Sequence, residues 1–189
     1  MTIPEPFSSI IKKNYATYSK NPQKFFSFCF TDLIKQLHIT DYQARASQTG
    51  KMFEHAFWYL MKQHGIELER DYIIKRACMD KGGSLDFGIL DGNKVICGIE
   101  AKGSDEDVSS RPALKRTDTV KKAIAQAYQF KRVFGKSVPF FVVTNVMPTG
   151  GNAKCMLDLA EGDIIDKVVD LTDEKQLNDF ISKLKKLSG

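Results

Sequence analysis

Residues 84–102 read SLDFGILDGNKVICGIEAK, and this segment predicts both a fold and a candidate site. Two alternating apolar runs flank an Asp-Gly-Asn turn, which is typical of a β-hairpin. Successive side chains of a strand point to opposite faces, so each strand has one apolar face that we expect to be core. The other face carries Asp86 on the first strand, and Glu100 and Lys102 on the second. We expect these three side chains on a sheet face that nothing covers. The expected core residues of the hairpin are Leu85, Phe87, Ile89, Val95, Cys97, Ile99 and Ala101.

The loop of this hairpin determines whether the charged side chains meet. A three-residue loop over residues 91–93 would pair Leu90 with Lys94 and place Gly98 opposite Asp86. Asp86 would then be a diagonal neighbour of Glu100, within reach of long side chains. A two-residue loop in a regular hairpin would instead pair Asp86 with a residue of the other face. The prediction therefore requires a loop of odd length or a β-bulge.

Two carboxylates and one ammonium on the same sheet face suit metal-dependent phosphate chemistry. Hard divalent cations such as Mg²⁺ prefer carboxylate, carbonyl and water oxygens. Such a cation polarises a phosphate and lowers the pKa of a bound water. A nearby lysine can position that water or offset developing negative charge. The alternative is that Glu100 and Lys102 form a solvated ion pair of little energetic consequence. Asp86 on the same face favours the metal site.

The order Asp86, strand–turn–strand spacer, Glu100-Ala101-Lys102 resembles the PD-(D/E)xK nuclease superfamily, which includes most type II restriction endonucleases. The upstream segment SQTGKMFE, residues 47–54, is similar to the first core helix of many of these nucleases. The resemblance covers roughly residues 47–146. Leu85 stands where the name-giving motif has proline. Because the motif is short and degenerate, it indicates a superfamily and not a particular enzyme.

This resemblance implies a site that uses Mg²⁺, for which Mn²⁺ could substitute. The carboxylates of Asp86 and Glu100 and the main-chain carbonyl of Ala101 would bind the ion. Lys102 would orient or activate the attacking water. Glu54 would act through a water or a second metal.

Glu54 also attracts interest on physical grounds. Its helical neighbours Trp58 and Met61 place it at the edge of an apolar stripe. A carboxylate there would be partly desolvated and would need a partner such as a metal. The alternative is an acid lying along the protein surface, and the sequence leaves both interpretations open.

We expect a single α/β domain over residues 1–189, with a mixed central β-sheet flanked by helices. A chain of 189 residues is long enough for one sizeable core and too short for two comfortable domains. A hydrophobic content of 42% with 13 Phe argues against disorder. Within this domain we expect an N-terminal helical segment over 1–40, a catalytic core over 41–171 and a C-terminal helix over 172–189. The expected helices span 8–19, 23–37, 41–63 (unbroken, or restarting near Gly50) and 117–134, and Thr40 and Gln43 would form a capping box for the third. The expected strands span 69–76, 138–145 and 164–171. We expect a long polar loop over 103–116 and a turn-rich loop over 147–152.

Several classes of protein are disfavoured. There is no apolar run long enough to cross a bilayer and no N-terminal pattern of a signal peptide, so we expect a cytoplasmic protein without membrane contact. No Gly-rich phosphate loop follows a strand, which argues against nucleotide hydrolysis. The cysteines and histidines are dispersed, which argues against disulfides and a zinc site. These residues are Cys29, Cys78, Cys97, Cys155, His38, His55 and His64.

The net charge of +5 permits a polyanionic partner without requiring one. A basic cluster follows Lys102 in the sequence and could clamp phosphates beside a scissile bond. Its members are Arg111, Lys115, Arg116, Lys121 and Lys122. The alternative is a solvated loop that enters a solvated helix. A second cluster near the N-terminus is interleaved with aromatic residues, which we expect to be core or dimer contacts.

The function predicted from these features is Mg²⁺-dependent hydrolysis of double-stranded DNA. A type II restriction endonuclease fits best, either as a homodimer or as a small catalytic subunit paired with a second nuclease or specificity subunit. A repair nuclease or junction resolvase of the same superfamily, and a DNA-binding module without catalysis, are the alternatives.

Overall fold

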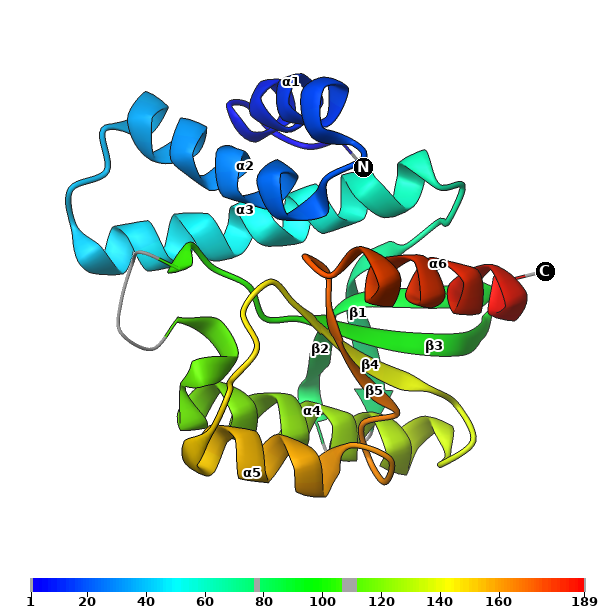
Figure 1. The fold of residues 1–189 in the computed structure, drawn as a ribbon. Helices are drawn as coiled ribbons and strands as arrows, with labels where there is room; N and C mark the ends of the chain where they lie inside the picture. The colour runs from blue at the N-terminus through cyan, green and yellow to red at the C-terminus, as the bar shows by residue number, and fades with distance from the viewer. Residues whose placement is uncertain (1, 77–78, 107–111, 189) are drawn as a thin grey trace.

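The computed structural model describes residues 2–76, 79–106 and 112–188 (Figure 1). Its centre is a five-stranded mixed sheet in the order β1-β2-β3-β4-β5. Strands β1 to β3 are antiparallel, and β3, β4 and β5 are parallel. The expectation of a mixed sheet with flanking helices is confirmed. The strands are β1 (Glu69–Arg76), β2 (Met79–Asp91), β3 (Lys94–Ala101), β4 (Phe140–Thr144) and β5 (Lys167–Asp170).

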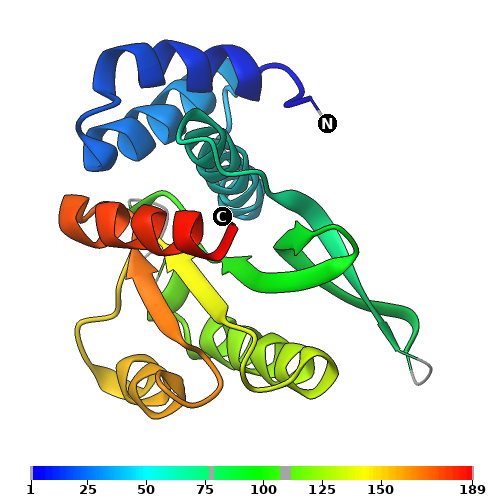
Figure 2. The same ribbon diagram turned by 90° about the vertical axis from the view of Figure 1, so that its right-hand side faces the viewer.

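Helices cover both faces of the sheet (Figures 1 and 2). One core cluster joins α1, α2, α3 and α6 to one face, and a second joins α4 and α5 to the other. Strand β4 serves both clusters, since Phe141 packs in the first and Val142 in the second. The prediction of an uncovered hairpin face is therefore wrong. The helices are α1 (Phe7–Tyr18), α2 (Pro22–Leu37), α3 (Tyr42–Gln63), η2 (Ala113–Lys115), α4 (Thr117–Phe134), α5 (Gly151–Ala160) and α6 (Glu174–Ser188).

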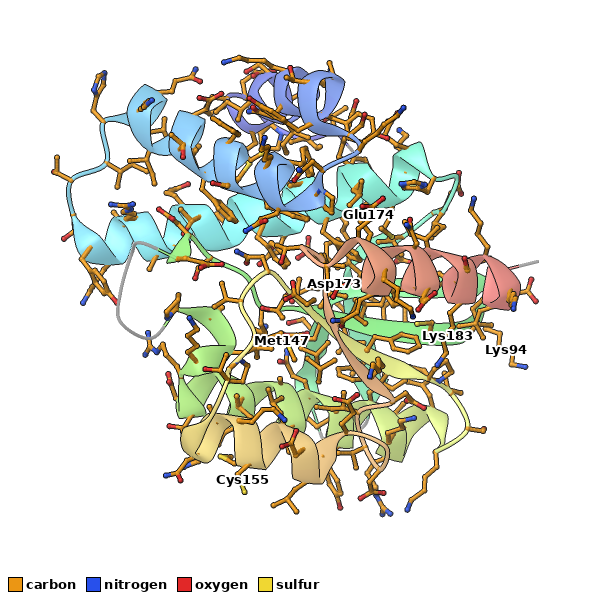
Figure 3. The ribbon with its side chains drawn as sticks, viewed as in Figure 1. Lys94, Met147, Cys155, Asp173, Glu174 and Lys183 are labelled. Carbon is orange, nitrogen blue, oxygen red and sulfur yellow. The ribbon has the colours of Figure 1, made fainter. Side chains whose placement is uncertain are left out.

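The helix ends follow from local capping. Asn21 accepts a hydrogen bond from the Lys24 amide (2.9 Å) ahead of Pro22, which suits the first turn of α2. Asp41 caps α3 through the amide of Ala44 (2.7 Å), so the cap lies one residue beyond the predicted Thr40. Helix α3 then runs without a break through Gly50. Asp173 caps α6 through the Gln176 amide (2.9 Å), so this helix starts at Glu174 (Figure 3) and not at Thr172.

The hairpin differs from the predicted one in its register. Its turn has two residues, with Asp91 opposite Lys94, and not the predicted three. The pairs Leu90–Val95 and Ile89–Cys97 leave Ile96 as an extra residue, which is a β-bulge. Gly98 therefore lies opposite Gly88 and not opposite Asp86. The bulge also divides the expected core face, because Val95 packs in the second cluster and Cys97 in the first.

The sequence pattern predicts neither helix α5 nor the short helix η2, which lies within the loop expected over 103–116. Helix α5 begins directly after Gly150, and Gly151 has a φ of 71°, which is typical of a turn. Exposed Cys155 lies on this helix (Figure 3), whereas Cys29 and Cys97 are buried, and all three are free thiols. Cys78 lies outside the described residues. Among the described residues, no helix is long and apolar enough to cross a membrane.

Candidate active site

The structure brings Asp86, Glu100 and Lys102 together. The pair Phe87–Ile99, continued by one residue, places Glu100 directly opposite Asp86 rather than on its diagonal. Asp86 Oδ2 accepts a hydrogen bond from the amide of Ala101 at 2.7 Å. The ammonium of Lys102 lies between the two acids, 3.4 Å from Asp86 Oδ2 and in contact with Glu100 Oε1. The bulge at Ile96 compensates for the two-residue turn, so that Asp86 and Glu100 lie on the same face of the hairpin.

Glu100 is buried, with a side chain only 1% exposed. It shares its strand face with Gly98, which packs against the ring of Phe130 in α4. Burial and the nearby charge of Asp86 raise the pKa of Glu100, and Lys102 opposes that rise. Burial would lower the pKa of Lys102, but the carboxylates of Glu100 and Asp86 outweigh it and raise this pKa. Lys102 is therefore an ammonium at neutral pH.

Glu54 of α3 lies beside this group and is partly buried. Burial, followed by the charge of Asp86, raises the pKa of Glu54 to about 7, while Lys102 and Arg70 oppose the rise. This partial burial agrees with the expectation of a partly desolvated carboxylate at the edge of an apolar stripe. A carboxyl group with a pKa near neutrality is suited to accepting a proton at physiological pH.

A groove of about 240 Å³ lies between α3, the end of β3 and the start of α4. Glu54 and Lys102 both line it, so the two groups face the same space. The other lining residues are Tyr42, Ala46, Gly50, Ala101, Gly103, Ser104, Pro112, Ala113, Arg116 and Thr119.

The predicted basic cluster lies near this groove but only partly in it. Of its described members, Arg116 alone lines the groove, and its guanidinium pairs with Asp118 at 3.1 and 2.9 Å. Lys115 ends η2 just before it, whereas Lys121 and Lys122 are exposed on α4. Arg111 lies outside the described residues.

Two residues of β1 belong to this neighbourhood, although the sequence did not single them out. Asp71 lies between the pairs Arg70–Phe87 and Tyr72–Leu85, and therefore opposite Asp86. Its φ of 51° is unusual for a residue other than glycine, and such conformations cluster at functional sites. Arg70 contacts Nδ1 of His55 at 2.7 Å, and its charge opposes the rise in the pKa of Glu54. The sequence predicts a strand that includes Arg70 and Asp71. Only the register between β1 and β2 shows that they lie beside Asp86.

The side chains at the hairpin fit a hard divalent cation. Asp86 and Glu100 present carboxylates from adjacent strands, and a cation, the Lys102 ammonium, already lies between them. Burial and the charge of Asp86 raise the pKa of both Glu54 and Glu100, and a divalent ion beside these carboxylates would offset that charge. Such an ion would be held by Asp86 and Glu100, beside Ala101. As they stand, the described residues contain no group of three or more His, Cys, Asp or Glu close enough together to hold a metal.

The raised pKa of Glu54 predicts how stability depends on pH when divalent ions are removed with EDTA. The native state keeps the Glu54 proton up to about pH 7, whereas the unfolded state loses it near the ordinary value of 4.5. The contribution of Glu54 is thus fully present below pH 4.5 and is lost as pH rises through 7. At pH 8 the Glu54→Gln protein should be more stable than wild type by about 2 to 3 kcal/mol. Urea unfolding at pH 4.5 and pH 8 measures this, and an equal difference at both values would contradict it.

The order of the sheet and the helices on both of its faces match the restriction endonuclease-like fold. A solved structure titled as a complex of restriction endonuclease PspGI with its substrate DNA is similar to this chain with a TM-score of 0.65. The similarity covers 98% of this chain and 93% of that chain, at 17% sequence identity. No family model matches the chain, and no curated protein matches it. At this identity the likeness shows the fold alone.

Proposed function

We propose that this protein is a Mg²⁺-dependent endonuclease that hydrolyses phosphodiester bonds in double-stranded DNA. The observation that carries the proposal is the contact of Lys102 with both Asp86 and Glu100, beside Glu54 and open to a groove. The likeness to PspGI supports the proposal, because its title names a restriction endonuclease bound to DNA.

Each residue has a distinct part in this proposal. A divalent cation held by Asp86 and Glu100 would polarise a phosphoryl oxygen and stabilise negative charge on the phosphate. Lys102, as an ammonium, donates hydrogen bonds that orient the attacking water and offset developing charge. Glu54 lines the same groove and would accept a proton from that water or act through a second metal.

The finer proposal is a type II restriction endonuclease, or the small catalytic subunit of one. A chain with one such centre cuts one strand, so cleavage of a duplex requires two copies or a second nuclease subunit. We therefore propose a homodimer, or a heterodimer in which the second subunit also supplies specificity.

End mapping tests this function. Purified protein is incubated with plasmid and phage DNA, with Mg²⁺, with Mn²⁺ and with EDTA, and the ends are sequenced. We expect metal-dependent breaks at fixed positions in linear duplex DNA. Cutting confined to branched or damaged DNA would instead support a resolvase or repair nuclease. DNA that is bound but left intact under every ionic condition would support a binding module and contradict the proposal.

The basic segment that enters α4 provides a prediction for DNA binding. Replacing Lys115 and Arg116 together by glutamate should weaken binding and reduce the slope of log K against log salt by about 1 per lost phosphate contact. Fluorescence anisotropy at several salt concentrations measures both quantities. Replacement of Lys185 and Lys186 by glutamate is the control, since it makes the same charge change at the far end of α6 (Figure 1). If both double variants changed DNA affinity and its salt dependence equally, the segment would not be part of the DNA-binding surface.

A further inference from the structure

The segment that carries Lys102 continues beyond the last residue of β3. Its backbone stays alongside the end of β4, where the amide of Lys102 donates to the carbonyl of Val143 at 2.9 Å. The ion pairs of Lys102 with Glu100 and Asp86 depend on where this backbone lies. Whatever fixes residues 102–104 therefore also limits where the ammonium can reach.

Thr144, the last residue of β4, bonds directly to this segment. Its side chain is fully buried, and Oγ1 lies 2.7 Å from the carbonyl oxygen of Lys102 and 3.2 Å from that of Val146. A hydroxyl has one proton to donate, and the shorter contact favours Lys102. The same oxygen accepts the amide of Val146 at 3.0 Å. The hydroxyl thus links the backbone of Lys102 to the chain that leaves β4.

Asn145 holds the same segment two residues further on. It is 5% exposed, and its Oδ1 accepts the amide of Ser104 at 3.0 Å while its Nδ2 donates to the Ser104 carbonyl at 2.8 Å. The amide group therefore satisfies both backbone groups of one residue. Neither alanine nor aspartate could make this pair of bonds, since the first has no polar atoms and the second has no donor when ionised.

Gly103, between these two anchors, packs against α3. A Cβ at this position would lie 2.2 Å from the ring of Phe53, the residue before Glu54. Residues 102–104 are thus held by β4 on one side and by α3 on the other. This arrangement fixes the Lys102 backbone relative to the helix that carries Glu54.

We propose that Thr144 and Asn145 are positioning residues, which act on the reaction through the backbone of residues 102–104 and so set the place of the Lys102 ammonium. The proposal rests on the proposed nuclease function. Buried polar groups are costly unless they are paired, and the side chains of Thr144 and Asn145 are paired with the backbone of this segment, although the hydroxyl of Ser104 has no partner among the described residues. Displacing a reacting group by about 1 Å can reduce a rate about 10²-fold.

The test compares two substitutions of Thr144. Thr144→Val keeps the side-chain shape and removes the hydroxyl, whereas Thr144→Ser keeps the hydroxyl. We expect Thr144→Val to lower the cleavage rate at saturating DNA about 10²-fold, with unchanged DNA affinity, and Thr144→Ser to restore most of the rate. Thr49→Val is the matched control, because Thr49 is also fully buried and donates to the Arg45 carbonyl of its own helix at 2.9 Å. It should cleave like wild type.

A second readout does not depend on cleavage. The rate at which reductive methylation modifies Lys102, followed by mass spectrometry, reports how firmly its ammonium is held. We expect slow modification in wild type, Thr144→Ser and Thr49→Val, and faster modification in Thr144→Val and Asn145→Ala. A wild type that cuts no DNA would refute the nuclease proposal, while the methylation rates would still decide the positioning. A folded Thr144→Val protein with wild-type cleavage and wild-type protection of Lys102 would overturn the inference. If Thr144→Val does not fold, Asn145→Ala decides by the same readouts.

Discussion

Asp86→Asn should reduce DNA cleavage by about 10³-fold or more, since a metal ion supplies several kcal/mol of charge stabilisation and each 1.36 kcal/mol is tenfold in rate. The amide oxygen of asparagine can still accept the Ala101 amide, which Asp86 accepts at 2.7 Å, so the fold should persist. A rate assay on plasmid DNA with Mg²⁺ and a circular dichroism melt measure the two effects.

Asp91→Asn is the control for Asp86→Asn. It makes the same chemical change on the same strand, at an exposed residue beside the hairpin turn, and should leave cleavage unaffected. Glu100→Gln and Lys102→Met should each lose about as much activity as Asp86→Asn. When several residues act as one catalytic unit, removing any one of them costs nearly as much activity as removing all. Near-wild-type cleavage by any two of these three variants would overturn the site assignment. Isosteric changes are needed because truncating buried Glu100 would leave a cavity.

Gly103→Ala should give the largest loss of stability among small substitutions at the site. The added Cβ would meet ring atoms of Phe53 at 2.2 and 2.4 Å, and Phe53 is fully buried against Phe26. Overpacking of this kind costs about 1 to 3 kcal/mol. Each kcal/mol lowers the melting temperature of a chain this size by about 2 to 4 °C. Because relief of the clash must shift either Phe53 or the backbone of residues 102–104, cleavage should fall as well.

Gly50→Ala is the matched comparison for Gly103→Ala. Gly50 lies within α3, and its added Cβ would meet only the carbonyl oxygen of Gly103, at 3.9 Å. Replacing a helical glycine with alanine should raise stability by about 0.5 to 1 kcal/mol. Differential scanning calorimetry should therefore show opposite shifts for the two variants. A Gly103→Ala protein as stable as wild type would show that Phe53 does not restrict this position.

The hairpin shows how far local sequence reasoning reaches. Alternation predicts its two strands and their polar faces, because the side-chain period of a strand is fixed. The sequence indicates that an odd-length loop or a bulge is needed to bring the charged residues to one face. It does not show that the bulge lies at Ile96, because strand pairing determines that position. The burial of Glu100 is a tertiary property, since α4, which packs against Gly98 on the same strand face, begins more than 15 residues further along the chain.

The local sequence pattern does not predict which residues long-range strand pairing brings to the site. Asp71 lies opposite Asp86 only through the β1–β2 register, and Thr144 and Asn145 reach residues 102–104 only because β4 pairs in parallel with β3. In the sequence, Thr144 and Asn145 read as the end of a buried strand. Helix α3 is predictable because its long periodic pattern is local, although its cap is Asp41 and not the expected Thr40. The same local pattern places Glu54 on this helix, whereas its raised pKa depends on burial and on the charge of Asp86, which only the tertiary structure provides.

The most direct test of the metal site is an anomalous difference map from a crystal soaked in Mn²⁺. We predict a peak bound by the carboxylates of Asp86 and Glu100, with the ammonium of Lys102 displaced from between them, and no such peak in Asp86→Asn crystals. Density that shows Lys102 still bridging both acids, with manganese absent from the hairpin, would contradict a metal-dependent nuclease built on these residues.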